Sequence, residues 1–282
     1  MTTPYTDHFI ELNDCRMHYQ DWGNAGAPAL LLVHGLTQTG HAFDGIAARL
    51  RERFHCLALD VRGRGESAWT PPETYELGQY AEDVTAFLDA LNIQQTHYIG
   101  ISMGGMIGMW LAAEAPKKFL SFALNDIGPE LGGGGLKRIS EYLATAPPTF
   151  NSMDHFIDSM LTRFPWLAEK PRAVLSQAFQ WSVRRNEDGS LSVKYDPNIT
   201  AGRPTDPERA KESVGRMWSG LRALTCPILL FRGLDSQLLT EEIAAKMQAA
   251  LPGMKFCGVP GVGHPVTLSD PPAWDALEGF YR

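Results

Sequence analysis

The sequence predicts an α/β protein with a mostly parallel sheet that helices cover on both faces. Short apolar runs alternate with helical patterns along most of the chain, at a spacing that leaves room for a helix between consecutive strands. Most of these runs are continuously apolar, as strands buried on both faces require. Of the 282 residues, 44% are hydrophobic and 20% are charged, so the chain can form one large core.

The strands follow from these apolar runs. Residues 8–12 and 16–21 alternate in polarity around the turn residues Asn13 and Asp14, which predicts an antiparallel hairpin at a sheet edge. Six further runs predict buried strands: residues 29–33, 55–59, 97–100, 119–124, 228–231 and 255–259.

Helical patterns fill the intervals between the strands. They cover residues 42–51, 77–91, 104–113 and 241–251. Thr240 can cap the helix that starts at residue 241, and Asp270 can cap a final helix with prolines in its first turn.

The middle of the chain departs from this alternation. Between about residues 129 and 220 it is rich in glycine, proline and tryptophan, with amphipathic stretches at 153–164 and 173–183. We therefore expect a core formed by residues 1–128 and 221–282, and a mainly helical cap formed by residues 129–220. Such a cap would lie over the strand ends and help to form a substrate pocket.

Charge and composition argue against nucleic acid and membrane partners. The formal net charge is −7, and the 25 basic residues are scattered rather than clustered. No apolar stretch reaches the length of a membrane helix, and the N-terminus does not resemble a secretory signal. The four cysteines form no CxxC pair, and we expect them to be reduced thiols of a cytoplasmic protein.

The strongest functional motif is GISMG at residues 100–104, between a predicted strand and a predicted helix. This context is typical of a nucleophile elbow, a strand-to-helix turn too tight for bulky residues beside the serine. Ser102 would then stand at a helix N-terminus, where N–H groups and the helix dipole favour a developing negative charge. The alternative is a glycine-rich turn without chemistry.

An oxyanion hole needs two N–H donors, one beside the nucleophile and one from a neighbouring loop. We expect the backbone N–H of Met103 to supply the first. Leu36, which follows the strand at residues 29–33, would supply the second. His34 would shape that loop through hydrogen bonds.

His264 and an aspartate would complete a triad with Ser102. His264 lies between the last predicted strand and the last predicted helix, so it can reach Ser102 across the sheet edge. Asp235 and Asp126 both follow predicted strands. We expect Asp235 to orient the imidazole, because it fits the chain order serine, aspartate, histidine; Asp126 is the alternative.

Together these motifs resemble the α/β-hydrolase superfamily over nearly the whole chain outside the cap. They include His34-Gly35, the segment DVRGRGES at residues 60–67, the elbow, GLD at residues 233–235 and Gly263-His264. The resemblance implies an α/β-hydrolase fold, with an eight-stranded, mostly parallel sheet and a cap inserted after the sixth strand. It also implies a structural duty for residues 60–67, with Arg62 holding that loop.

Within the superfamily, the elbow is most similar to 3-oxoadipate enol-lactonases and related small esterases, and the layout is similar to carbon–carbon hydrolases of aromatic-ring degradation. Epoxide hydrolases and haloalkane dehalogenases carry an aspartate at the elbow, so Ser102 argues against both. We therefore expect hydrolysis of a carboxylic ester or lactone through an acyl-enzyme. Three alternatives stay open: hydrolysis of a meta-cleavage-type diketone, a cofactor-free perhydrolase or haloperoxidase reaction, and a non-catalytic ligand-binding role.

The expected substrate is a small molecule of apolar character, because the cap and the elbow supply large apolar side chains. The candidate pocket residues are Trp166, Trp181, Met106 and Trp218.

Three arginines of the cap could bind a substrate carboxylate, but an ordinary exposed arginine is the default expectation for each: Arg163, Arg184 and Arg185. No cofactor or metal is expected, since the histidines and acids lack a ligand spacing such as HExxH. For the oligomeric state, a homodimer is an open alternative.

Overall fold

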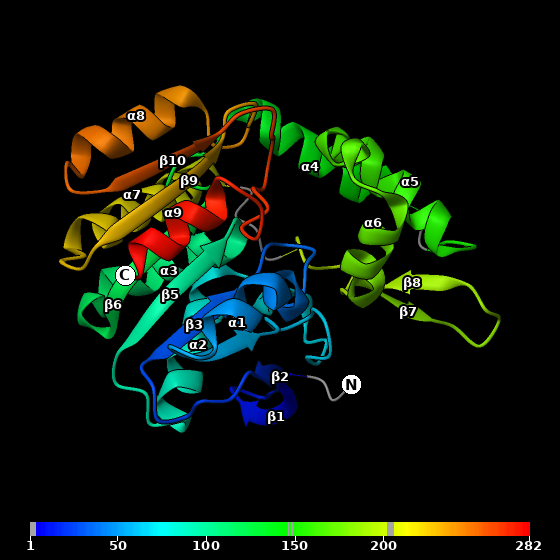
Figure 1. Cartoon of the computed structure of the whole chain (residues 1–282), viewed down its shortest axis with the longest axis horizontal. Coiled ribbons are helices and arrows are strands. Elements are labelled where there is room, and N and C mark those ends of the chain that lie inside the picture. The colour runs from blue at the N-terminus through cyan, green and yellow to red at the C-terminus, as the bar shows by residue number, and fades with distance from the viewer. Residues whose placement is uncertain (1–3, 146, 148, 202–205) are drawn as a thin grey trace.

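The computed structural model describes residues 4–145, 147, 149–201 and 206–282. An eight-stranded sheet runs through it in the order β1-β2-β4-β3-β5-β6-β9-β10 (Figure 1). The strands are β1 (Thr6–Leu12), β2 (Cys15–Asp21), β3 (Ala29–Val33), β4 (His55–Leu59), β5 (Thr96–Ile101), β6 (Phe119–Asn125), β9 (Ile228–Gly233) and β10 (Lys255–Val259).

The sheet is mostly parallel, as predicted. β1 and β2 form an antiparallel hairpin at one edge, and β2 also runs antiparallel to β4. All other neighbouring strands of this sheet are parallel, so their carboxyl ends meet along one edge. The predicted hairpin at the sheet edge and the six further strands are therefore confirmed, but β10 forms the other edge of the sheet, and only Val259 among its residues is buried.

Helices cover both faces of the sheet. One face carries α2 (Leu77–Ala90), α3 (Met103–Glu114), α7 (Pro207–Ala223) and α8 (Glu241–Ala250). The other carries α1 (Asp44–Leu50) and α9 (Ala273–Phe280). Short 3-10 turns lie at η1 (Gly40–Phe43), η2 (Pro72–Thr74) and η3 (Pro116–Lys118).

Strand β3 shows why the buried strands are apolar throughout. Leu31 and Val33 pack into the core under α2, α3, α7 and α8, whereas Leu30 and Leu32 pack into the core under α1 and α9. Side chains alternate between the two faces of a strand, so a strand covered on both faces has no polar side.

Of the two predicted helix caps, one is confirmed and one is wrong. The Thr240 hydroxyl accepts a hydrogen bond from the Ile243 N–H at 3.3 Å and starts α8 as expected. Helix α9 begins only at Ala273, without a side-chain cap. The Asp270 carboxylate instead binds the Lys170 ammonium at 2.6 Å, which draws it away from the helix.

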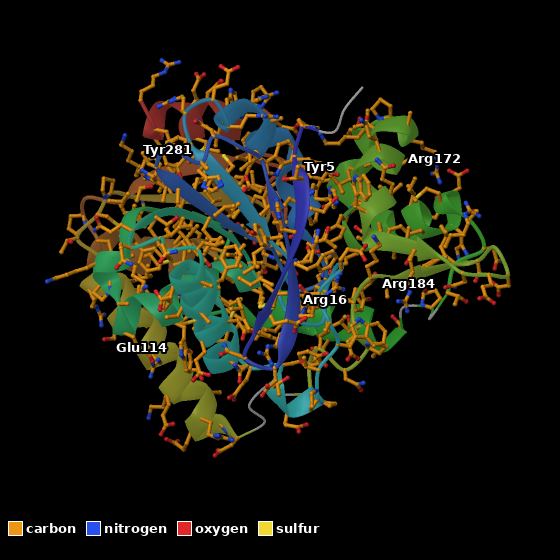
Figure 2. The ribbon with its side chains drawn as sticks, turned by 90° about the horizontal axis from the view of Figure 1, so that it is seen from below. Tyr5, Arg16, Glu114, Arg172, Arg184 and Tyr281 are labelled. Carbon is orange, nitrogen blue, oxygen red and sulfur yellow. The ribbon has the colours of Figure 1, made fainter. Side chains whose placement is uncertain are left out.

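The elements between β6 and α7, which we call the lobe, lie beside the sheet (Figure 1). They are α4 (Gly133–Thr145), α5 (Met153–Arg163), η4 (Pro165–Glu169), α6 (Arg172–Phe179), η5 (Gln180–Ser182), β7 (Val183–Arg185) and β8 (Leu191–Val193). Seen from below, Arg172 and Arg184 mark the lobe on one side of the molecule, and Glu114 and Tyr281 mark the opposite side (Figure 2). The lobe has its own small core of Phe150, Phe156, Met160, Val183 and Leu191.

The lobe begins after β6, where the cap was expected, but it ends earlier than residue 220. Helix α7 lies along α3, and Gly220 allows this close approach because a side chain there would collide with the Met109 carbonyl. The helical layer of the core thus resumes at Pro207. No helix in the described part of the chain combines the length and the apolar character that crossing a membrane requires.

Candidate active site

Ser102 occupies a strained turn between β5 and α3. Its backbone has φ 51° and ψ −114°, a conformation that residues other than glycine rarely adopt. The turn is tight because the helix starts directly against β3, where a side chain at Gly104 would collide with the Val33 carbonyl. The glycine of the motif therefore allows the serine to be held in this position at the N-terminus of α3.

His264 lies in the loop after β10 and reaches Ser102 across the sheet edge. Its Nε2 is 2.8 Å from Ser102 Oγ, and its Nδ1 is 2.8 Å from Asp126 Oδ2. An ionised carboxylate can only accept, so Nδ1 carries the proton and Nε2 can accept the serine proton. The buried Asn125 side chain fixes this loop by bonding both the carbonyl and the N–H of Val266, at 2.8 and 3.1 Å.

The carboxylate at His264 belongs to Asp126, and this corrects the expectation that Asp235 orients the imidazole. Asp126 directly follows β6 and is fully buried, with φ 54°. It accepts hydrogen bonds from the Gly233 N–H at 2.9 Å and the Ser236 hydroxyl at 2.6 Å.

Asp235 lies elsewhere because it comes two residues after the end of β9. Its side chain is exposed, and its own N–H donates to the Val262 carbonyl at 3.0 Å. Its neighbours Gly233 and Ser236 both turn inward toward Asp126. The segment after β9 thus serves the site by holding Asp126.

The two predicted oxyanion donors lie beside the serine. Gly35, which precedes Leu36, comes so close to Ser102 that a side chain on Gly35 would approach the Ser102 Cβ to 3.5 Å. Within the described residues, neither the Leu36 N–H nor the Met103 N–H has a hydrogen-bond acceptor. Both are available to a substrate oxygen, and their role stays a prediction.

The loop that carries Leu36 is held by two buried side chains. His34 accepts a hydrogen bond from the Val61 N–H at 3.0 Å and donates to the Gly35 carbonyl at 2.7 Å. Burial lowers the pKa of His34 to about 4, so it stays neutral and structural, as expected. Arg64 donates to the Leu36 carbonyl at 3.1 Å.

Sequence reasoning missed the role of Arg64. The resemblance implied that Arg62 holds the loop at residues 60–67, and the buried ion pair of Arg62 with Asp83 on α2, at 2.5 Å, fits that role. Arg64 also donates to Tyr80 of α2 at 2.8 Å. The sequence of this short segment does not indicate which of its two arginines points toward the active site.

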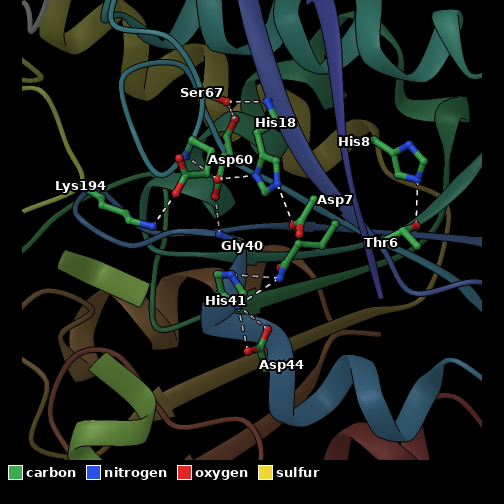
Figure 3. Close-up of polar contacts among 12 residues, drawn as sticks. Thr6, Asp7, His8, His18, Gly40, His41, Asp44, Asp60, Ser67 and Lys194 are labelled. Atoms are coloured by element: carbon green, nitrogen blue, oxygen red, sulfur yellow. Dashed lines mark hydrogen bonds and ion pairs between the residues drawn. The ribbon is translucent and has the colours of Figure 1, made fainter. Parts of the chain in front are cut away.

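A second buried network anchors the same segment to the hairpin (Figure 3). Asp60 accepts hydrogen bonds from the Gly40 N–H at 2.7 Å and from His18 Nδ1 at 2.7 Å, and His18 Nε2 lies 2.9 Å from Asp7. Burial alone would raise the pKa of Asp60. The hydrogen bond from His18 and the electrostatic interactions with His34 and His18 outweigh burial and bring this pKa below its usual value. For His18, burial acts to lower the pKa, and the two carboxylates outweigh it and raise the pKa.

Comparison with known proteins agrees with this geometry. Residues 28–271 match the family model described as the alpha/beta hydrolase fold. The chain belongs to the α/β-hydrolase family. Among curated proteins it is similar to a 3-hydroxybutyrate-oligomer hydrolase of Cupriavidus necator, at 32% identity over 91% of this chain and 89% of that one.

This α/β hydrolase is also similar to a second curated protein and to a solved structure. A 3-oxoadipate enol-lactonase of Acinetobacter baylyi is 33% identical over 44% of this chain and 46% of its own. The crystal structure of an alpha/beta hydrolase from Novosphingobium aromaticivorans superposes with a TM-score of 0.88 at 28% identity, covering 99% of both chains.

A cavity in this α/β hydrolase leads to His264 between the lobe and the loops that follow β9 and β10. The residues that line it are Gly135, Arg138, Ile139, Arg163, Phe164, Trp166, Asp235, Gln237, Leu238, Gly263 and His264. The Trp166 ring packs directly on Gly263, where any side chain would clash with it. The lobe therefore contributes one wall of the space next to the histidine.

Of the predicted pocket residues, Trp166 lines this cavity and three others have different surroundings. Trp181 stacks on His41 of η1 with 4.0 Å between ring centroids. Trp218 lies on α7 and donates to Glu130 at 3.1 Å. Met106 lies in α3 with its side chain packed against the core under that face.

Proposed function

We propose that this α/β hydrolase cleaves a carboxylic ester, with Ser102 as the nucleophile, His264 as the general base and Asp126 as the acid that orients His264. The observation that carries the proposal is the continuous chain of two 2.8 Å contacts from Ser102 Oγ through the imidazole to Asp126. In the neutral imidazole with its proton on Nδ1, both contacts are hydrogen bonds and Nε2 can accept the serine proton.

The reaction would proceed in two halves. His264 Nε2 takes the proton from Ser102 as Oγ attacks the ester carbonyl, and Asp126 stabilises the imidazolium that forms. The N–H groups of Leu36 and Met103 would receive the negative oxygen. His264 then protonates the leaving alcohol, and water repeats the sequence on the acyl-enzyme.

Two relatives support an ester or lactone, although others are named for amide-type substrates, such as an N-formylmaleamate deformylase of Pseudomonas putida. The similar Cupriavidus necator protein is named for oligomers of a hydroxy acid, and the Acinetobacter baylyi protein for a lactone. In both compound classes a carbonyl is linked through oxygen, as this mechanism requires. An ester or lactone of a small acid is therefore the preferred substrate class.

The proposal is tested with 4-nitrophenyl esters from acetate to octanoate, on the wild type and on Ser102→Ala. We expect turnover by the wild type and none above background by the variant, because the nucleophile is gone. A serine-directed phosphonate should label the wild type at Ser102. Esterase activity that survives in a correctly folded Ser102→Ala protein would refute the assignment.

A further inference from the structure

Arg163 places a positive charge in the wall of the cavity that leads to His264. It is the last residue of α5, and its Nη1 donates to the Thr37 hydroxyl at 3.1 Å. Thr37 directly follows Leu36, the proposed oxyanion donor. Arg163 and His264 line the same cavity, so a molecule bound in that cavity beside His264 can also contact Arg163.

The immediate surroundings of this guanidinium are aromatic rather than acidic. It lies 4.2 Å from the centre of the Tyr142 ring and 4.8 Å from that of Phe164. Burial among these groups lowers the pKa of Arg163, although an arginine keeps its charge in this range. A guanidinium removed from water is costly unless an anion or a full set of acceptors accompanies it.

Some other arginines of the chain pair with carboxylates, whereas the buried Arg64 and Arg232 donate to backbone carbonyls. Arg62 is buried with Asp83, and Arg172 on the lobe surface binds Asp154 and Asp158. Within the described residues no carboxylate lies at salt-bridge distance from Arg163 or from Arg138, which lines the same cavity. The one acidic side chain among the residues that line the cavity is Asp235.

We propose that Arg163 binds a carboxylate of the substrate, so that the natural ester carries a free acid group besides the bond that is cleaved. The inference rests on the proposed function and narrows it to anionic esters. Guanidinium N–H groups that neither Thr37 nor Tyr142 engages can form two parallel hydrogen bonds to a planar carboxylate, and the flanking rings partly shield them from water.

The two other predicted arginines do not share this position. Arg184 and Arg185 lie on β7, where Arg184 contacts the Ser192 hydroxyl and Arg185 the Gly189 carbonyl. Neither is among the residues that line the cavity. Arg163 is therefore the residue to change.

The test compares two substrates that differ in one charge: the mono-4-nitrophenyl ester of adipic acid, and the 4-nitrophenyl ester of its monoamide. They match in length and closely in size, and only the first is anionic at pH 7. We expect the wild type to favour the acid in kcat/KM. Arg163→Gln should lower kcat/KM for the acid by about 10- to 100-fold, as loss of a charge-assisted hydrogen bond does, and change that for the amide by less than about threefold.

Two further variants serve as controls. Arg163→Lys keeps the charge without the planar fork and should retain part of the preference for the acid. Arg172→Gln removes an arginine of the same lobe that lies on its surface, and it should leave both rates unchanged. A wild type that treats the two esters alike, or an Arg163→Gln protein that loses both activities equally, would overturn the proposal.

Binding to an inactive protein separates this inference from the proposed function. Calorimetry should show that Ser102→Ala binds the adipate half-ester about tenfold or more tightly than Ser102→Ala/Arg163→Gln does. Absence of turnover in the wild type together with that difference would contradict the ester mechanism and uphold the carboxylate site. Equal binding by the two proteins would overturn the site even if Ser102-dependent hydrolysis is observed.

Discussion

At the scale of the residue, Asp126 is positioned by its own partners before it meets His264. Gly233 and Ser236 donate to its two oxygens, and its backbone N–H donates to the Phe231 carbonyl. A carboxylate fixed in this way can hold the imidazole in one tautomer and one orientation. It lies fully inside the protein, where its charge acts on His264 without screening by water.

This arrangement predicts different outcomes for two aspartates. Asp126→Asn should lower kcat for a 4-nitrophenyl ester by about three to four orders of magnitude, because an amide can no longer stabilise the imidazolium. Asp235→Asn should lower it by less than about tenfold. Steady-state kinetics on both variants, with circular dichroism to confirm folding, decide the matter. The reverse ranking would restore Asp235 as the acid.

The sequence could not separate these two residues. Both follow an apolar strand, and both come between Ser102 and His264, so chain order favours neither. What distinguishes them is that Asp126 follows β6 at once with a positive φ, whereas Asp235 comes after a further turn. That difference depends on backbone geometry, which residue types alone do not reveal.

At the scale of the element, hydrogen bonds to the buried Asp60 carboxylate connect the hairpin β1–β2 to the active-site loops. His18 on β2 contacts Asp60, and Asp60 also binds the N–H of Gly40 and of Glu66, so one buried carboxylate connects three segments. The elements that sequence predicted well are those with a continuous apolar pattern, such as β3 and β4. The expected cap included most of α7, which packs on the core only near its end, through Met217, Gly220 and Leu221.

The raised pKa of His18 predicts a pH-dependent stability. Its protonated form is favoured by folding, so this contribution is complete below the unfolded pKa of about 6.5 and is lost as pH rises through the folded pKa. Melting temperatures of the wild type should exceed those of His18→Gln by several degrees at pH 6, and by less at pH 9.

The comparison between variants removes the effect of other histidines. His34 has a lowered pKa and acts with the opposite sign, but it is the same in both proteins. His8→Gln, at an exposed position on the neighbouring strand, is the matched control and should follow the wild type across the pH range. A difference that does not change with pH would show that His18 is not protonated in the folded protein.

At the scale of the whole molecule, the lobe and the sheet share the wall of one cavity. The two chemical roles that we propose are divided between them: Ser102, Asp126 and His264 come from loops of the sheet, and Arg163 comes from the lobe. The sequence predicted that an insertion would cover the strand ends, because its composition breaks the strand–helix alternation. It could not predict which aromatic residues face His264, since aromatics at helical spacing pack equally well inside the lobe.

Trp166 is the contact that limits this shared space, since its ring lies on Gly263 beside His264. Trp166→Ala should raise the ratio of kcat/KM for octanoate to that for butyrate about tenfold or more, because the removed indole leaves room for a longer acyl chain. The 4-nitrophenyl ester panel measures this ratio. Trp181→Ala removes the ring that stacks on His41 outside the cavity, so it should lower the melting temperature and leave the ratio unchanged. An unaltered ratio in Trp166→Ala would contradict the assignment of Trp166 to the cavity wall.

The distance along the chain between serine and histidine has a consequence during synthesis. His264 follows Ser102 by 162 residues, so the ribosome completes the elbow, the lobe and β9 long before it adds the base. A nascent chain can begin to fold around the early strands while it carries a serine that no imidazole can deprotonate. Under the mechanism that we propose, a polypeptide released before residue 264 lacks the base for Ser102, and only translation through the final loop completes the triad.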